Sequence, residues 1–184
     1  MAAVNWFEIG ILHWIEKSLH TPFFNAVMPV VSSLGNAGWF WILVSLALLI
    51  GKKTRNVGLA MAFALAFSLV VANITLKPLV SRIRPFDLDP TFSLLIAAPK
   101  DFSFPSGHTQ ASFAAATALF FHRRRAGLVA LILAVVISFS RLYLCVHFPS
   151  DVLAGMIIGV GLGFLAATIA DGMRHSPLRK RDVD

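Results

Sequence analysis

Charged residues are scarce in this sequence, and their scarcity decides its class. Lys, Arg, Asp and Glu make up 14% of the 184 residues, whereas hydrophobic residues make up 57%. A soluble domain carries about 25% charged residues. The composition therefore excludes an ordinary soluble domain, and the long apolar runs predict an all-α, polytopic membrane bundle. We expect one compact bundle without a second, soluble domain.

Cysteine is also nearly absent. The single cysteine, Cys145, excludes an intrachain disulfide, and its apolar neighbours predict a buried packing thiol. No Cys/His cluster or carboxylate cluster indicates a metal, so no metal or other cofactor is expected. The formal charge of +7 does not indicate nucleic-acid binding, because the basic residues gather in short loops between apolar runs.

The apolar runs predict six transmembrane spans within a membrane domain over residues 21–172. Their approximate ranges are 22–35, 38–51, 57–80, 107–122, 127–144 and 150–170. Each of the first two is only about 21 Å long at 1.5 Å per residue, short of the ~30 Å hydrocarbon core. Residues 1–20 mix aromatic and charged side chains, which predicts an interfacial amphipathic helix. In the last span, Gly155, Gly159 and Gly163 predict close helix packing.

The basic residues predict the orientation of the bundle. Ten lie in the loops after the second and fourth spans and in the tail over 173–184: Lys52, Lys53, Arg55, Arg123, Arg124, Arg125, Arg174, Arg179, Lys180 and Arg181. Five lie on the other side: Lys77, Arg82, Arg84, Lys100 and Arg141. The positive-inside rule places the first set and the tail in the cytoplasm. The long loop after residue 80 then faces outside, and with six spans the N-terminus is cytoplasmic.

The stretch 140–151 contains the strongest candidate for chemistry. Pro149 favours a helix start, and a helix there could bring Asp151 under the imidazole of His147, four residues earlier. A carboxylate on one ring nitrogen fixes the tautomer and leaves the other nitrogen free to act. The structural alternative is that Asp151 complements a helix N-terminus and Arg141 snorkels.

A second motif ends the third span. Lys77, Ser81 and Arg84 have the spacing of one helix face, and Pro85 places Arg84 near the helix end. Two cations on one face, with no acidic partner nearby in sequence, indicate an anion site. Snorkelling anchors are the alternative, and we expect Arg82, which points elsewhere, to be one.

A third motif opens the fourth span. Ser106 suits an N-cap, and Gly107 permits a turn. The same geometry exposes backbone N–H groups to an anion, with His108 beside it in the first turn. By span parity all three motifs lie on one side of the membrane. Cations with a carboxylate-oriented histidine suit phosphoryl transfer, where positioning and charge neutralisation supply most of the catalysis.

The three motifs together resemble the signature of the type 2 phosphatidic acid phosphatase superfamily. They read Lys77-x6-Arg84-Pro85, Pro105-Ser106-Gly107-His108 and Ser140-Arg141-x5-His147-x3-Asp151. The resemblance implies that His147 attacks phosphorus and becomes a phosphohistidine, that Asp151 orients it, and that His108 protonates the leaving group and then activates water. It also implies that the phosphoryl oxygens are held by Lys77, Arg84, Arg141, Ser106 and Gly107. Local chemistry alone does not distinguish the two histidines.

The resemblance implies an integral-membrane lipid phosphatase that needs no metal, with its site on the extracytoplasmic face of the cell membrane. Undecaprenyl diphosphate is the favoured substrate, because that lipid carrier is released on that face. The alternatives are a phosphatidylglycerophosphate or phosphatidate phosphatase, and a lipid phosphotransferase using the same site. A transporter is a further rival, although transporter sites usually lie near the bilayer midplane and not at span ends.

Overall fold

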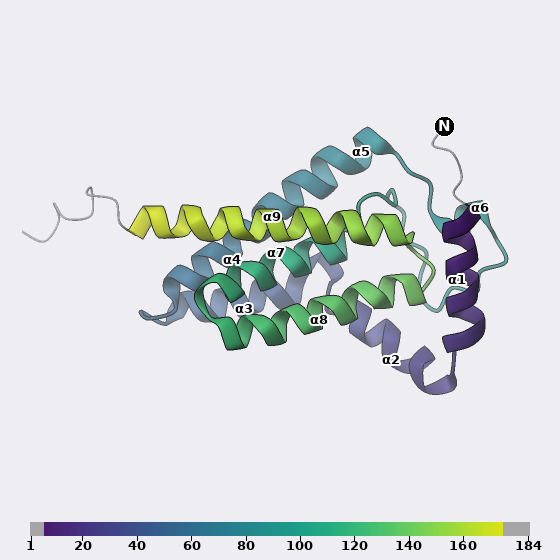
Figure 1. The fold of residues 1–184 in the computed structure, drawn as a ribbon, viewed down its shortest axis with the longest axis horizontal. Helices are drawn as coiled ribbons and strands as arrows, with labels where there is room; N and C mark the ends of the chain where they lie inside the picture. The colour runs from purple at the N-terminus through teal and green to yellow at the C-terminus, as the bar shows by residue number, and fades with distance from the viewer. Residues whose placement is uncertain (1–5, 175–184) are drawn as a thin grey trace, which may run out of the picture.

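Residues 6–174 are described in the computed structural model, and helices and loops account for all of them (Figure 1). The all-α prediction is therefore confirmed for this part of the chain. In order, the helical elements are α1 (Trp6–Leu19), α2 (Pro22–Ser33), η1 (Asn36–Gly38), α3 (Trp39–Ile50), α4 (Arg55–Ser68), η2 (Leu69–Leu76), α5 (Lys77–Val80), α6 (Pro85–Leu88), α7 (Gly107–His122), α8 (Arg124–Tyr143) and α9 (Pro149–Arg174). The predicted tail beyond Arg174 lies outside the described residues.

Three described stretches are long and apolar enough to cross a membrane. They are Arg55–Leu88, Arg124–Tyr143 and Pro149–Arg174. The first holds α4, the π-helical η2 and α5, which follow one another without a gap as far as Val80. With 16 residues, α7 is shorter than these stretches, and it runs among the other helices.

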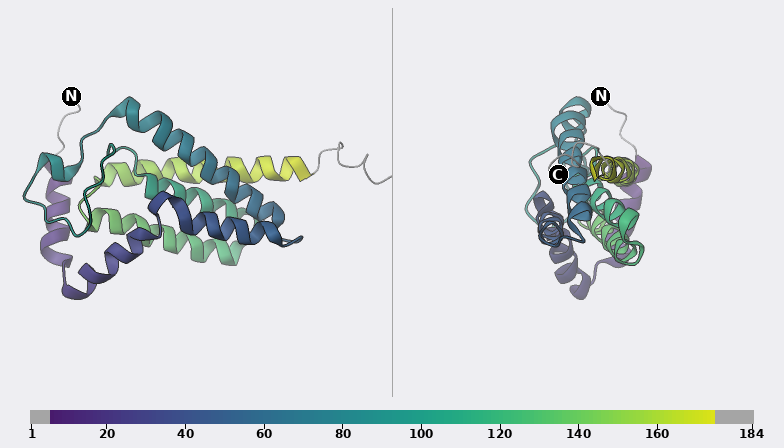
Figure 2. Two further views of the ribbon diagram at one scale, coloured as in Figure 1. Left: turned by 180° about the vertical axis from the view of Figure 1, so that it is seen from behind. Right: turned by 90° about the vertical axis from the view of Figure 1, so that its left-hand side faces the viewer.

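The segments 22–35 and 38–51, expected to be two separate spans, form one bent pair. α2 and α3 meet at an angle of 48°, at a break where Ala37 and Gly38 have positive φ. The chain therefore continues from the end of the bundle near α1 to the opposite end, as Figure 2 shows. Each helix of 12 residues is about 18 Å long, too short to cross a ~30 Å core alone.

α7 and α9 pack closely through small residues, as the glycine spacing predicts. A Cβ on Gly159 would lie 2.5 Å from the carbonyl oxygen of Gln110, and one on Gly163 would lie 2.4 Å from that of Ala114. Nearer the site, a Cβ on Gly155 would lie 2.8 Å from the carbonyl oxygen of Ser106. Side chains at these positions would push apart α7, which begins at Gly107, and α9, which begins at Pro149.

α1 lies across one end of the bundle, beside α6 and the turn between α8 and α9 (Figure 1). Its buried face, which includes Leu12, belongs to a cluster with Tyr143 and Phe148. Cys145 lies in the same cluster and is fully buried, which confirms the predicted packing thiol. Burial, with the nearby charge of Glu16, raises the pKa of this thiol to about 12. The interfacial location expected for residues 1–20 stays a prediction.

Candidate active site

The three sequence motifs meet around a polar cavity of about 350 Å³. Five predicted site residues line it: Lys77, Arg84, His108, Arg141 and His147. Asp101 and Asn36, which the sequence did not indicate, line it too. The cavity therefore combines three cations and two imidazoles in a space suited to a small anion.

His147 lies in the turn between α8 and α9 and is almost completely buried. Its Nε2 lies 3.4 Å from Nη1 of Arg84, and its Nδ1 lies 3.6 Å from Oδ2 of Asp151. Burial lowers the pKa of His147 to about 3; Asp151 opposes this shift, and the charges of Arg141 and Arg84 add to it. The imidazole is therefore neutral at neutral pH, as a nucleophile must be.

Asp151 lies in the first turn of α9 and has no exposed surface. Its Oδ2 accepts hydrogen bonds from the Ser103 hydroxyl at 2.5 Å and from the backbone N–H of Phe148 at 2.9 Å. Its Oδ1 accepts a hydrogen bond from Arg82 at 2.6 Å. The carboxylate thus caps the start of α9 and also faces His147; its orienting role stays a prediction.

The prediction that Lys77, Ser81 and Arg84 share one helix face is wrong. α5 ends at Val80, Ser81 adopts a left-handed conformation with φ of 48°, and Arg84 is extended. The break turns the chain, so Arg84 reaches the cavity from a loop instead of from the helix that carries Lys77.

Both cations also have an acidic partner, contrary to expectation. Oδ1 of Asp101 accepts a hydrogen bond from Arg84 at 2.6 Å, and its other oxygen pairs with Lys77. Burial alone would raise the pKa of Asp101, but the contacts with Lys77 and Arg84 outweigh it and lower that pKa to about 2. The pairing spans 17 and 24 residues, so only the folded loop reveals it.

Arg141 and His108 complete the cavity wall. Nη1 of Arg141 donates to the Ser32 hydroxyl, while its buried Nε has no hydrogen-bond partner within the described chain. Nε2 of His108 lies 2.9 Å from Oδ1 of Asn36. An unpaired buried donor is costly, so the Arg141 guanidinium, which lines the cavity, has hydrogen-bonding capacity that the described chain leaves unused.

The start of α7 supplies fewer donors than the motif suggested. The backbone N–H of Ser106 donates to the carbonyl of Asp151 at 3.1 Å, and its hydroxyl accepts a hydrogen bond from Thr109. That N–H is therefore already engaged. The Gly107 backbone lies close to Lys77: a Cβ on Gly107 would lie 3.8 Å from Nζ of Lys77.

Arg82 is not the interfacial anchor that the sequence indicated. Its guanidinium pairs with Asp151 at 2.6 Å and with Glu8 of α1 at 2.7 Å, and it lies 4.0 Å over the ring of Phe148. Sequence reasoning missed Glu8 and Ser103 as well. Acidic residues among the apolar residues of the N-terminal helix could have indicated that Glu8 has a buried partner. The unusual length of the loop after residue 80 could have indicated that it holds a site residue such as Ser103.

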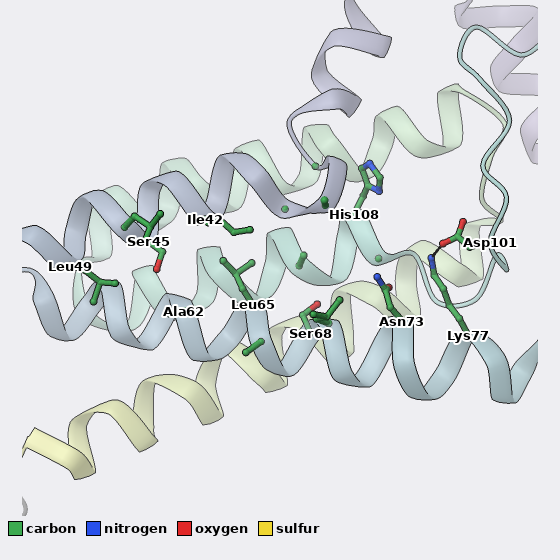
Figure 3. Close-up of a pocket in the computed structure, with 18 residues that line it drawn as sticks. Ile42, Ser45, Leu49, Ala62, Leu65, Ser68, Asn73, Lys77, Asp101 and His108 are labelled. Atoms are coloured by element: carbon green, nitrogen blue, oxygen red, sulfur yellow. Dashed lines mark hydrogen bonds and ion pairs between the residues drawn. The ribbon is translucent and has the colours of Figure 1, made fainter.

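An apolar groove of about 750 Å³ adjoins the polar cavity and runs between α3 and α4. Figure 3 shows Lys77, Asp101 and His108 at one end of it and Ser45 and Leu49 toward the other. The groove shares those first three residues with the polar cavity. One ligand with an anionic head and an apolar tail could therefore occupy both.

Residues 57–173 match the PAP2 superfamily. The chain belongs to this superfamily. This PAP2 protein is 35% identical over 147 residues to the undecaprenyl-diphosphatase of Sulfolobus acidocaldarius, with 79% of this chain and 70% of the relative covered. It is 38% identical over 162 residues to the putative undecaprenyl-diphosphatase YbjG of Escherichia coli, with 88% of this chain and 72% of the relative covered.

A solved structure has the same fold. The transmembrane PAP2 type phosphatidylglycerolphosphate phosphatase from Bacillus subtilis superposes with a TM-score of 0.76 at 26% identity, over 95% of this chain and 90% of that chain. The predicted family is thereby confirmed, and the PAP2 chain is an integral-membrane protein of the lipid phosphatase class. The family match begins at residue 57, so Glu8, Ser32 and Asn36 reach the site from outside the matched range.

Proposed function

We propose that this PAP2 lipid phosphatase hydrolyses undecaprenyl diphosphate to undecaprenyl phosphate and inorganic phosphate. One observation carries the proposal: a cavity with Lys77, Arg84 and Arg141 adjoins an apolar groove between two helices. The cavity suits the diphosphate head, and the groove suits a long hydrocarbon chain. The names of the two relatives above support the same substrate class.

In the first chemical step, Nε2 of His147 attacks the terminal phosphorus. The bond from that phosphorus to the bridging oxygen breaks, and His108 donates a proton to the departing lipid phosphate. In the second step, His108 takes a proton from water, whose oxygen attacks phosphorus and breaks its bond to Nε2. Inorganic phosphate leaves, and both histidines return to their starting states. One water is consumed in each cycle.

The proposed roles of the other residues follow from charge. Lys77, Arg84 and Arg141 neutralise the phosphoryl oxygens, which is where phosphoryl transfer needs most help. Asp151 stabilises the positive charge that His147 acquires when its nitrogen bonds to phosphorus. Gly107 lines the adjoining groove and Ser106 is fully buried, so neither borders the polar cavity itself.

We also propose that the chain crosses the membrane five times, the bent pair α2–α3 counting once. This revises the six spans expected from sequence. It keeps the loops of highest positive charge in the cytoplasm and the site on the extracytoplasmic face. It moves α1 to the same face as the site, which agrees with the contacts between α1 and the turn before α9.

The test is a substrate panel with one purified preparation. We expect kcat/KM for undecaprenyl diphosphate to exceed that for phosphatidylglycerophosphate and phosphatidate by at least about tenfold, with activity retained in a chelator. A preference for phosphatidylglycerophosphate would favour the function named for the Bacillus subtilis structure. Adding lipid or sugar alcohols tests the phosphotransferase alternative, which predicts a phosphorylated acceptor in place of inorganic phosphate.

A further inference from the structure

We propose that Arg82 and Glu8 form a relay that positions Asp151, so that helix α1 takes part in setting the geometry of His147. The inference rests on the roles proposed above for His147 and Asp151. Neither Arg82 nor Glu8 lines the polar cavity, and Glu8 lies outside the residues that match the PAP2 superfamily.

The first step is the orientation of the Asp151 carboxylate. Ser103 and the backbone of Phe148 hold Oδ2, the oxygen that faces the imidazole. Among the described residues, Arg82 donates the hydrogen bond to Oδ1, at 2.6 Å. Because Asp151 is fully buried, loss of this donor would leave one oxygen of a charged group without a partner. The carboxylate would then be held through Oδ2 alone, by Ser103 and Phe148, and its plane would be less well fixed relative to His147.

The second step is the support of Arg82 itself. Its Nη2 donates to Oε2 of Glu8 at 2.7 Å, and its Nη1 also reaches the Ser150 hydroxyl at 2.6 Å. The other oxygen of Glu8 accepts the backbone N–H of Ser150 at 2.7 Å. Glu8 is only 5% exposed, so both of its oxygens are committed to the start of α9 and to Arg82.

The third step is the charge of the relay. Glu8 and Asp151 carry two negative charges, and Arg82 between them carries one positive charge. The remaining negative charge faces His147, where it favours the positive charge that the ring gains in the covalent step. Arg82 therefore acts on the reaction through Asp151 without touching the phosphate, which makes it a positioning residue.

A relay and a purely structural clamp predict different kinetics. If the contacts only fasten α1, their loss would lower the amount of folded protein. The molecules that fold would keep a normal kcat and KM. Misplacement of Asp151 slows the covalent step while the phosphate-binding cations remain intact. A positioning role therefore lowers kcat and leaves KM nearly unchanged.

The experiment compares Arg82→Met, Arg82→Lys and Glu8→Gln, with Arg125→Met and Lys17→Met as charge-matched controls at exposed sites. Each full-length variant is purified, its folded fraction is measured, and kcat and KM are determined with a lipid diphosphate that the wild type hydrolyses. We expect Arg82→Met to lower kcat about 10²-fold, less than the ~10⁴-fold typical for loss of an orienting aspartate. Arg82→Lys should recover part of that loss, because it keeps the charge.

Glu8→Gln gives an independent measurement, and carries the test together with Arg82→Lys if Arg82→Met does not fold. It should lower kcat about tenfold alone and cause no further loss in the Arg82→Met background, because residues in one network are not additive. The relay is refuted if the Arg82 variants match Arg125→Met in kcat, or if the two losses add fully. If the wild-type protein released no inorganic phosphate from any lipid phosphate or diphosphate, the proposed function itself would be overturned.

Discussion

Asp101 changes what is expected of the cations at the site. Its carboxylate contacts both Lys77 and Arg84, two of the residues proposed to hold the phosphoryl oxygens. With a pKa of about 2 it is anionic at neutral pH. Its side chain is 53% exposed and lines both the cavity and the groove. If Lys77 and Arg84 hold the phosphoryl oxygens as proposed, phosphate and Asp101 compete for the same two cations.

This competition makes Asp101→Asn informative. The amide keeps the shape and removes the charge, so we expect orthovanadate to bind about tenfold more tightly, a factor in keeping with two partly exposed ion pairs. The inhibition constant for phosphate release measures it, with Asp87→Asn, an exposed acid in the same loop, as the control. Weaker vanadate binding would mean that Asp101 positions the cations and does not compete.

His147 gives a prediction about pH. Burial lowers its pKa to about 3, so between about pH 3 and 6.5 the unfolded chain binds a proton that the folded chain does not. The free energy of unfolding contributed by this group therefore falls as pH decreases through that window. The ring ¹⁵N resonances of His147 are assigned as those present in the wild type and absent from His147→Gln. We expect these resonances to show no titration between pH 5 and 8. A midpoint near 6.5 would contradict the buried neutral imidazole.

Several residues of the site could be predicted from sequence and others could not. The spacing of His147 and Asp151 was readable because four residues at a helix start keep two side chains near each other. Asp101, Arg82 and Glu8 act through contacts across 17 to 74 residues, which depend on how the long loop and α1 fold back. No local sequence pattern predicts contacts between residues so far apart in the chain.

At the scale of helices, the groove between α3 and α4 should select the lipid chain. Ala62 lines the groove, so Ala62→Trp should fill it and raise KM for a long-chain lipid diphosphate about tenfold. Hydrolysis of a soluble aryl phosphate should stay within about twofold, because its reaction needs only the polar cavity. Ala47→Trp, on the exposed surface of α3, is the matched control. Equal effects on both substrates would place the lipid chain elsewhere.

Helices α2 and α3 show how apolar runs can outnumber membrane spans. Residues 22–50 contain two apolar runs separated by Gly35 and Asn36, a pattern that predicts a turn. The structure uses that break for a 48° bend instead of a reversal. Hydropathy reports apolar length and does not report direction, so the number of crossings needed the folded chain. The helical character of the runs and the glycine spacing of α9 could, by contrast, be recognised locally, although the partner helix α7 could not.

At the scale of the whole molecule, the orientation is testable with single cysteines. Cys145 is buried, so a Cys145→Ser background should be tolerated and silent. We expect an impermeant maleimide to label Ala98→Cys and Ser18→Cys from outside intact cells, and Ala126→Cys only after permeabilisation. Labelling of Ala98 without Ser18 would restore six crossings. Labelling of Ala126 alone would place the site in the cytoplasm.

The central claim is that the phosphoryl group passes through His147. The most direct measurement is rapid quenching of the wild-type enzyme with a lipid diphosphate labelled in its terminal phosphate, followed by mapping of the labelled peptide. The account predicts an acid-labile, base-stable phosphate on His147 that forms and decays fast enough to support turnover, and that is absent in His147→Ala together with phosphate release. Normal phosphate release by His147→Ala, or label on another residue with the same kinetics, would contradict it.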